Sequence, residues 1–161
     1  MISSPANRFV TEECPIVGQV SASQSLDIAA APDAVVGALA DYEVVRPAIL
    51  PEQYRDYKVI SGGKGDGTVV HWILQATSKR QRDVQATVSV TPDTVTERDA
   101  NSTMVTTYSV AASGSGSRVT TTTTWQGAGG IGGFFEKTFA PKGLNRIQAE
   151  VLGNLKKRLE S

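Results

Sequence analysis

The sequence predicts an α+β domain in which an antiparallel sheet of about seven strands curves around one long C-terminal helix. Short runs of alternating apolar and polar residues fill much of the chain, and this period of two is typical of strands. The closing segment changes to a helical period, with apolar residues at steps of three or four: Leu144, Ile147, Val151, Leu155 and Leu159. Because a single helix cannot hide such a stripe from water, we expect it to pack against the preceding sheet.

The N-terminal part of the chain predicts an arm, a first strand and a broken helical segment. Residues 1–19 show no clear period and contain turn-forming residues, so we expect an arm ahead of a single domain that spans residues 20–161. Residues 20–30 alternate and predict the first strand. Pro32, followed by an aspartate, is a helix-start signal, and Pro47 interrupts the helical segment, which predicts short helices here.

The middle of the chain predicts a series of hairpins. The expected strands lie within residues 56–76 (two strands around a glycine-rich turn), 82–92, 93–99, 103–112 and 117–125. The threonine run of the last strand is consistent with this assignment, because threonine is β-branched and favours strands. Short turns between these segments predict antiparallel pairing of consecutive strands.

Length and composition narrow the class of protein. A chain of 161 residues fits one domain, and 16 basic against 16 acidic residues give a formal net charge of zero. No basic stripe with interleaved aromatic residues is present, so we do not expect a nucleic-acid partner. Cys14 is the only cysteine and there is no Cys/His cluster, so the sequence predicts neither a metal site nor a cofactor. We expect a cytoplasmic protein without stable membrane insertion, because the chain shows neither a signal-peptide pattern nor a stretch of about 20 apolar residues.

Three stretches of the chain resemble the helix-grip superfamily, which includes START lipid-transfer domains, the birch pollen allergen and bacterial polyketide cyclase/dehydrase-like proteins. They are SLDIAAAPDAVVGALADYE (25–43), GGKGDGTVVHWIL (62–74) and LNRIQAEVLGNLKKRLES (144–161). The polyketide cyclase/dehydrase-like proteins are the most similar group. The resemblance implies a cavity between the curved sheet and the last helix that holds lipids, sterols or aromatic polyketides. Members of the superfamily range from carriers to enzymes, so the fold does not choose among these activities.

His71 and Trp72 are neighbours in an apolar strand, and only one of them can face the cavity. His71 is the only histidine of the chain, and a cavity-lining histidine could act as a general acid or base. Val70, Trp72 and Leu74 share the more apolar face, which favours Trp72 as the ligand-binding residue and His71 as an outward-facing ring. The pattern alone leaves both orientations open.

Further candidate ligand-binding residues lie on the last two strands and the last helix. Hydroxyl and aromatic side chains on an apolar wall could orient the oxygens of a ligand, although they could equally be ordinary strand residues. These candidates are Tyr108, Thr121, Thr123 and Trp125. Ile147 and Val151, at the centre of the helical stripe, are expected to cover the ligand.

A glycine-rich bridge, QGAGGIGGFFEKTF (126–139), connects the last strand to the last helix. Its Phe134 and Phe135 could close over a ligand or contact a membrane surface, with the glycines as hinges. Alternatively, the phenylalanines fill one end of the core and the glycines permit a sharp reversal of the chain.

The sequence therefore predicts a protein that binds an apolar or aromatic small molecule between sheet and helix, and it leaves the oligomeric state open. One alternative is a cyclase/dehydrase-type enzyme in which Tyr108 or His71 moves a proton. A second alternative is a lipid chaperone that docks transiently on membranes or partners. The sequence offers no obvious acid–base pair for the enzyme, because the nearest carboxylates by strand order, Glu97 and Asp99, are expected to be exposed.

Overall fold

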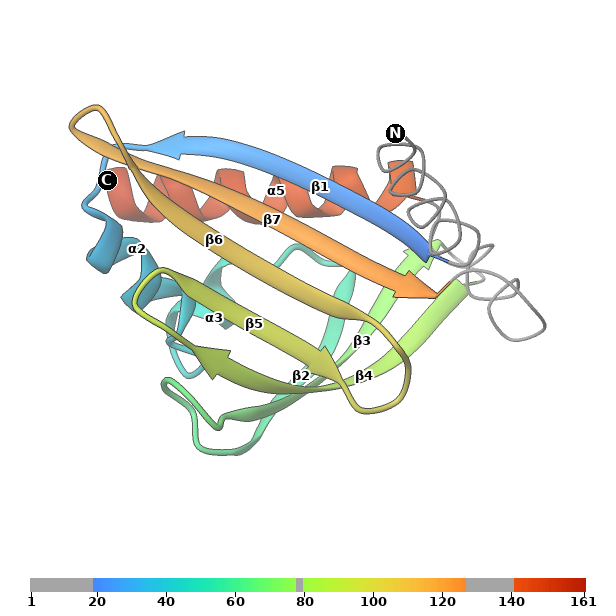
Figure 1. The fold of residues 1–161 in the computed structure, drawn as a ribbon. Coiled ribbons are helices and arrows are strands. Elements are labelled where there is room, and N and C mark those ends of the chain that lie inside the picture. Colours follow the sequence, from blue (N-terminus) through green and yellow to red (C-terminus); the bar gives the residue numbers. More distant parts are fainter. Residues whose placement is uncertain (1–18, 78–79, 127–140) are drawn as a thin grey trace, which may run out of the picture.

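A computed structural model describes residues 19–77, 80–126 and 141–161, and it has the predicted α+β architecture (Figure 1). The elements in chain order are β1 (Gln19–Ile28), α2 (Pro32–Leu39), α3 (Val45–Ile49), β2 (Tyr54–Ser61), β3 (Val69–Thr77), β4 (Arg80–Val90), β5 (Thr94–Asp99), β6 (Val105–Ser113), β7 (Gly116–Gln126) and α5 (Pro141–Glu160). The described strands form a seven-stranded sheet in the order β1-β7-β6-β5-β4-β3-β2. The predicted hairpins from β2 to β7 are confirmed.

Strand β1 does not pair with its neighbour in sequence but with β7, in antiparallel register from Gln19 opposite Gln126 to Ile28 opposite Ser117. The excursion through α2 and α3 separates β1 from β2, so these two strands form opposite edges of the sheet. The sheet bends around the core, and α5 runs along β1 (Figure 1). Helix α2 packs against β5, β6 and β7 at one end of the molecule.

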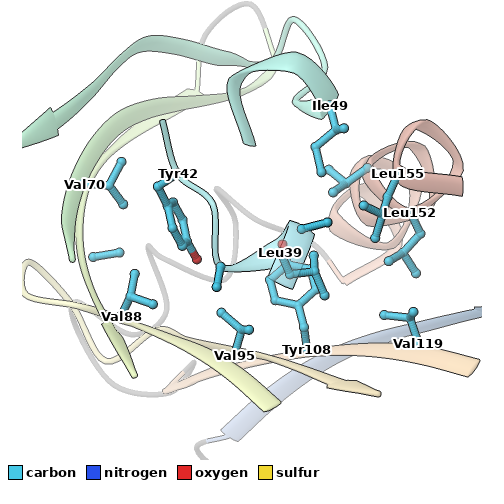
Figure 2. Close-up of a cluster of buried hydrophobic side chains, with 14 of the residues drawn as sticks. Leu39, Tyr42, Ile49, Val70, Val88, Val95, Tyr108, Val119, Leu152 and Leu155 are labelled. Carbon is cyan, nitrogen blue, oxygen red and sulfur yellow. The ribbon is translucent and has the colours of Figure 1, made fainter. Parts of the chain in front are cut away.

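The apolar stripe of α5 is buried as the helical period predicts. Leu144, Ile147, Val151 and Leu155 are buried, and Leu159 near the C-terminus is half-buried. Leu152 is buried as well, and Figure 2 shows it beside Leu155 in the core. The buried face is therefore wider than the predicted stripe, as expected for a helix that packs into a curved sheet rather than on a flat one.

The loop between α2 and α3 is fixed against the β2–β3 turn. The Tyr42 N–H donates to the carbonyl of Gly63 at 2.8 Å, and the Tyr57 hydroxyl donates to the carbonyl of Tyr42 at 2.6 Å. Gly63 has a φ of 140°, which L-residues with side chains rarely adopt, and any Cβ there would collide with Glu43. The glycine-rich turn therefore serves to hold Tyr42 in a defined position inside the sheet.

A substitution in α5 tests how much of the stability its buried stripe carries. We expect Leu155→Ala to lower the free energy of unfolding by about 2–5 kcal/mol, because Leu155 is fully buried and its removal leaves a cavity. Urea denaturation monitored by circular dichroism measures this loss. Leu159→Ala, on the same helix but half-buried, serves as the control and should cost less. Equal losses at both positions would contradict this distribution of packing energy.

Candidate ligand site between the sheet and the C-terminal helix

A cavity of about 20 Å³ lies between the inner face of the sheet and α5, and space of that size holds about one water molecule. Its lining comes from β2, β3, β5, β6, β7, α5 and the β5–β6 loop: Tyr54, Trp72, Leu74, Glu97, Met104, Thr106, Tyr108, Thr123, Leu144 and Gln148. The lining combines aromatic and aliphatic side chains with hydroxyl, amide and carboxylate groups. The cavity thus combines an apolar surface with several convergent polar groups, as small-molecule sites do.

The aromatic wall is built around Trp72. The Tyr54 ring meets it edge-on, with centroids 5.6 Å apart, and the Tyr57 ring lies parallel to it at 6.4 Å. Trp72 is 5% exposed, and its Nε1–H donor has no acceptor in the described part of the chain. A buried N–H of this kind can donate to a ligand oxygen.

The polar part of the lining contains an amide that connects α5 to β6 and β7. Gln148 on α5 donates through Nε2 to the Thr123 hydroxyl on β7, and that hydroxyl lies 2.8 Å from the hydroxyl of Thr106 on β6. The other amide atom, Gln148 Oε1, is buried and has no donor partner among the described residues. Gln148, which lines the cavity, therefore keeps a buried hydrogen-bond acceptor without a partner in the described part of the chain.

Beneath the cavity, a buried arginine joins α3 to the sheet. Arg46 Nη2 lies 3.0 Å from Glu97 Oε2, and the two side chains are 2% and 6% exposed. The guanidinium lies between the rings of Tyr42 and Tyr108, 4.6 and 4.5 Å from their centroids, in cation–π geometry. Arg46 Nε also donates to the carbonyl of Leu39 at 2.7 Å. This arrangement satisfies a buried charge from several directions at once.

The two tyrosine hydroxyls of this cluster have different roles. Tyr42 donates to Glu97 Oε2 at 2.6 Å and accepts from Arg46 Nη2 at 3.0 Å, so it is fully engaged. Tyr108 accepts from Arg46 Nη1 at 3.3 Å, and its own O–H has no acceptor among the described residues. Since Tyr108 lines the cavity, its proton is available to a ligand.

Burial keeps these phenols protonated at neutral pH. Burial raises the pKa of Tyr108 to about 12, although the Arg46 charge opposes the shift. Burial likewise raises the pKa of Tyr42 well above its ordinary value, against the opposing effect of Arg46. Burial alone would lower the pKa of Arg46, but Tyr42, Tyr108 and Glu97 together raise it, so the guanidinium stays charged. Tyr108 is therefore a hydrogen-bond donor in the cavity and not a proton acceptor.

The structure separates the residues that the sequence singled out. Trp72, Tyr108 and Thr123 line the cavity. His71 is absent from this lining and pairs with Asp83 through Nε2 and Oδ1 at 2.8 Å on the partly exposed face of the sheet. The remaining described candidates are buried in the core without lining the cavity: Thr121, Trp125, Ile147 and Val151. Phe134 and Phe135 lie outside the described residues, so their lid, plug or membrane-docking roles stay predictions.

The expectation that Glu97 and Asp99 are exposed is wrong. They are 6% and 8% exposed because they share the inward parity of Val95 on β5. The charge of Arg46 neutralises Glu97, and the Tyr42 hydroxyl donates a hydrogen bond to it. Asp99 accepts hydrogen bonds from the Ser102 hydroxyl and from nearby backbone N–H groups. The parity with Val95 was the signal in the sequence that could have located both carboxylates.

Sequence reasoning also missed Gln148 and the role of Arg46. Gln148 lies four residues after Leu144, so the helical period places it on the buried face. Arg46 belongs to a short proline-containing helix, where no periodic pattern marks its direction.

No group of three or more His, Cys, Asp or Glu side chains in the described ranges could hold a metal ion. No helix in these ranges has the length and hydropathy that a membrane span requires.

A curved antiparallel sheet wrapped around a C-terminal helix, with short helices after the first strand and a cavity under the last helix, defines the helix-grip class of proteins. Residues 19–160 match the family described as polyketide cyclase / dehydrase and lipid transport. The chain belongs to this family, which confirms the resemblance seen in the sequence.

Several solved structures are similar to this protein in fold. The NMR structure of KanY protein is 58% identical, covers 89% of this chain and 99% of its own, and superposes with a TM-score of 0.83. An aromatase/cyclase, Zhui from Streptomyces sp. R1128, is 14% identical over 88% of this chain and 94% of its own, with a TM-score of 0.67. A major latex-like protein of Panax ginseng is also 14% identical, covering 88% and 97% with a TM-score of 0.65. The last two likenesses show the fold alone. No curated protein matches the chain.

The buried phenols predict a loss of stability at high pH. Burial raises the pKa of all four tyrosines: Tyr42, Tyr54, Tyr57 and Tyr108. A raised pKa in the folded state favours the neutral phenol, so this stabilisation is complete below about pH 10 and declines as the pH rises above it. We expect phenolate absorbance to appear together with unfolding, and the melting temperature to fall, above that pH. Titration of all four phenols near pH 10 in a protein that remains folded would contradict this expectation.

Proposed function

We propose that this protein binds a largely apolar, aromatic small molecule in the cavity between the sheet and α5. The observation that carries the proposal is a pair of buried polar atoms in this region, the Trp72 Nε1–H donor and the Gln148 Oε1 acceptor, neither of which has a partner in the described part of the chain. Leaving such a group unpaired costs about 1–3 kcal/mol. A ligand that hydrogen-bonds both atoms would recover that cost.

The lining favours a flat, apolar ligand body. Trp72 offers an aromatic surface, and Leu74, Met104 and Leu144 complete the apolar wall around it. The present cavity holds about one water molecule, so a ligand must displace side chains as it binds. Met104 and Leu144 are suited to such a change, because methionine adapts its shape readily and both residues lie on the cavity surface. We therefore describe this conformation as the closed form of the site.

Membership in the family supports the same function. The family description includes lipid transport as well as cyclisation and dehydration, and one protein with this fold is an aromatase/cyclase. All these activities require a protected apolar space for a small molecule. Polar atoms without partners in such a space give this proposal a residue-level basis beyond the fold.

Binding of 2,6-dihydroxynaphthalene, measured by titration calorimetry, tests the proposal, because a probe with two hydroxyls can pair with Gln148 and with a second polar group of the cavity at the same time. We expect Gln148→Leu to raise the dissociation constant about tenfold, because the hydrogen bond from one of the two ligand hydroxyls is lost. Leu152→Met is the matched control, since Leu152 is buried on the same helix but does not line the cavity. Absence of dihydroxynaphthalene binding to the unmodified protein, or equal affinity for both variants, would contradict the proposal.

A second candidate function, an enzyme that enolises a ketone, is favoured by one observation: Glu97 and Tyr108 both line the cavity. Glu97 would accept a proton from the carbon next to a ligand carbonyl. The electron pair of that C–H bond would move toward the carbonyl oxygen, which the Tyr108 O–H would stabilise by a hydrogen bond. Glu97 would thus be the proton acceptor that the enzyme requires and that the sequence alone did not indicate. His71, on the other face of β3, takes no part in this scheme.

Hydrogen–deuterium exchange at the α-carbon of 2-tetralone in deuterated buffer, followed by NMR, tests the enzymatic candidate. We expect Glu97→Gln to slow protein-dependent exchange by about 100-fold or more, because the proton acceptor is lost. Asp83→Asn makes the same carboxylate-to-amide change at an exposed position and should leave the rate unchanged. No acceleration by the unmodified protein, or equal rates for the two variants, would reject catalysis without affecting the binding proposal.

A further inference from the structure

We infer that Glu97 and Tyr108, held in place by Arg46, form a paired hydrogen-bond acceptor and donor that selects neutral hydroxylated ligands and rejects carboxylates. This inference rests on the proposed binding function and specifies its ligand class. It follows from the hydrogen bonds of one buried cluster, in which Arg46 is fully engaged within the protein while Glu97 and Tyr108 each keep one group for a ligand.

Glu97 presents the charge that a ligand would meet. It is the only residue with a formal charge in the described lining of the cavity. Its Oε2 atom is occupied by the Tyr42 hydroxyl at 2.6 Å and by Arg46 at 3.0 Å. The second oxygen, Oε1, has no hydrogen-bond partner among the described residues and is free to accept from a ligand. A group that carries a proton on oxygen or nitrogen suits this atom.

The positive charge of Arg46 is not available to a ligand. Its Nε, Nη1 and Nη2 atoms already donate to Leu39, Tyr108 and Tyr42, and Nη2 also pairs with Glu97. The aromatic rings of Tyr42 and Tyr108 cover the guanidinium, and Arg46 does not line the cavity. An anionic ligand would therefore approach the carboxylate of the pair and not the guanidinium.

Tyr108 completes the pair as a donor. Its oxygen accepts from Arg46 Nη1, which leaves the phenolic proton without an acceptor among the described residues. One ligand hydroxyl can therefore accept from Tyr108 and donate to Glu97 Oε1. A carboxylate can only accept, so it can satisfy Tyr108 but leaves Glu97 unpaired and is repelled by it. Sites built to hydrogen-bond a hydroxyl discriminate strongly against ligands that cannot complete the pair.

Three probes with the same ring system test this selectivity: 2-naphthol, naphthalene and 2-naphthoate, titrated calorimetrically at neutral pH. For the unmodified protein we expect 2-naphthol to bind about tenfold more tightly than naphthalene and at least about 100-fold more tightly than 2-naphthoate. Glu97→Gln should remove most of the discrimination against 2-naphthoate. Glu150→Gln, an equivalent change at an exposed position on α5, should leave all three affinities unchanged.

The possible results distinguish failure of the proposed selectivity from failure of the proposed binding function. If none of the probes binds, the proposed binding function is wrong and the inference fails with it. If the probes bind with equal affinity, or 2-naphthoate binds most tightly, the inference is overturned while the binding function stands. If the Glu97→Gln variant does not fold, the Tyr108→Phe variant tests the selectivity in its place. It must weaken 2-naphthol binding about tenfold and leave naphthalene unchanged, and any other pattern overturns the inference.

Discussion

The ion pair between Arg46 and Glu97 is the interaction on which the interior depends. It connects α3 to the middle of the sheet, and the rings of Tyr42 and Tyr108 enclose it. Taking two charges out of water is costly, and an uncompensated buried charge costs about 3–5 kcal/mol. The pair therefore requires its full set of hydrogen bonds, and this requirement fixes where α3, the α2–α3 loop and β5 lie relative to one another.

This constraint divides the interior into two regions with different chemistry. On the α5 side, Leu152 and Leu155 pack with other aliphatic side chains, as Figure 2 shows. Where Tyr108 projects from β6, the core contains a charged and hydrogen-bonded cluster, and the cavity lies at the boundary between the two regions. A ligand at this boundary meets both apolar side chains and hydrogen-bonded polar groups. The fold forms the cavity, and Arg46 holds the two polar residues Glu97 and Tyr108 that line it.

The sequence predicted the hairpins from β2 to β7 and the buried stripe of α5, because both depend on a period repeated over many residues. The family was recognised from three resembling stretches, and the pairing of β1 with β7 was not predicted. Alternation also favoured Trp72 as the inward-facing residue of its strand, where the structure places it. The polar cluster could not be predicted in the same way. Arg46, Glu97 and Gln148 come from separate elements, and only the folded chain shows that they neutralise or hydrogen-bond groups far away in sequence. Buried charges violate the rule that polar residues face water, so pattern reasoning placed Glu97 on the wrong side of β5.

The pairing of β1 with β7 has a consequence for how the chain folds. Gln19 lies opposite Gln126, so the first described strand can join the sheet only after the last strand has formed. The hairpins from β2 to β7 are local in sequence and can assemble without it, whereas β1 and α5 must add to their exposed edge and inner face. Contacts between distant segments form slowly, because closing a long loop costs entropy before any contact is gained. During synthesis on the ribosome, β1 must therefore remain without its partner strand until β7 has been made.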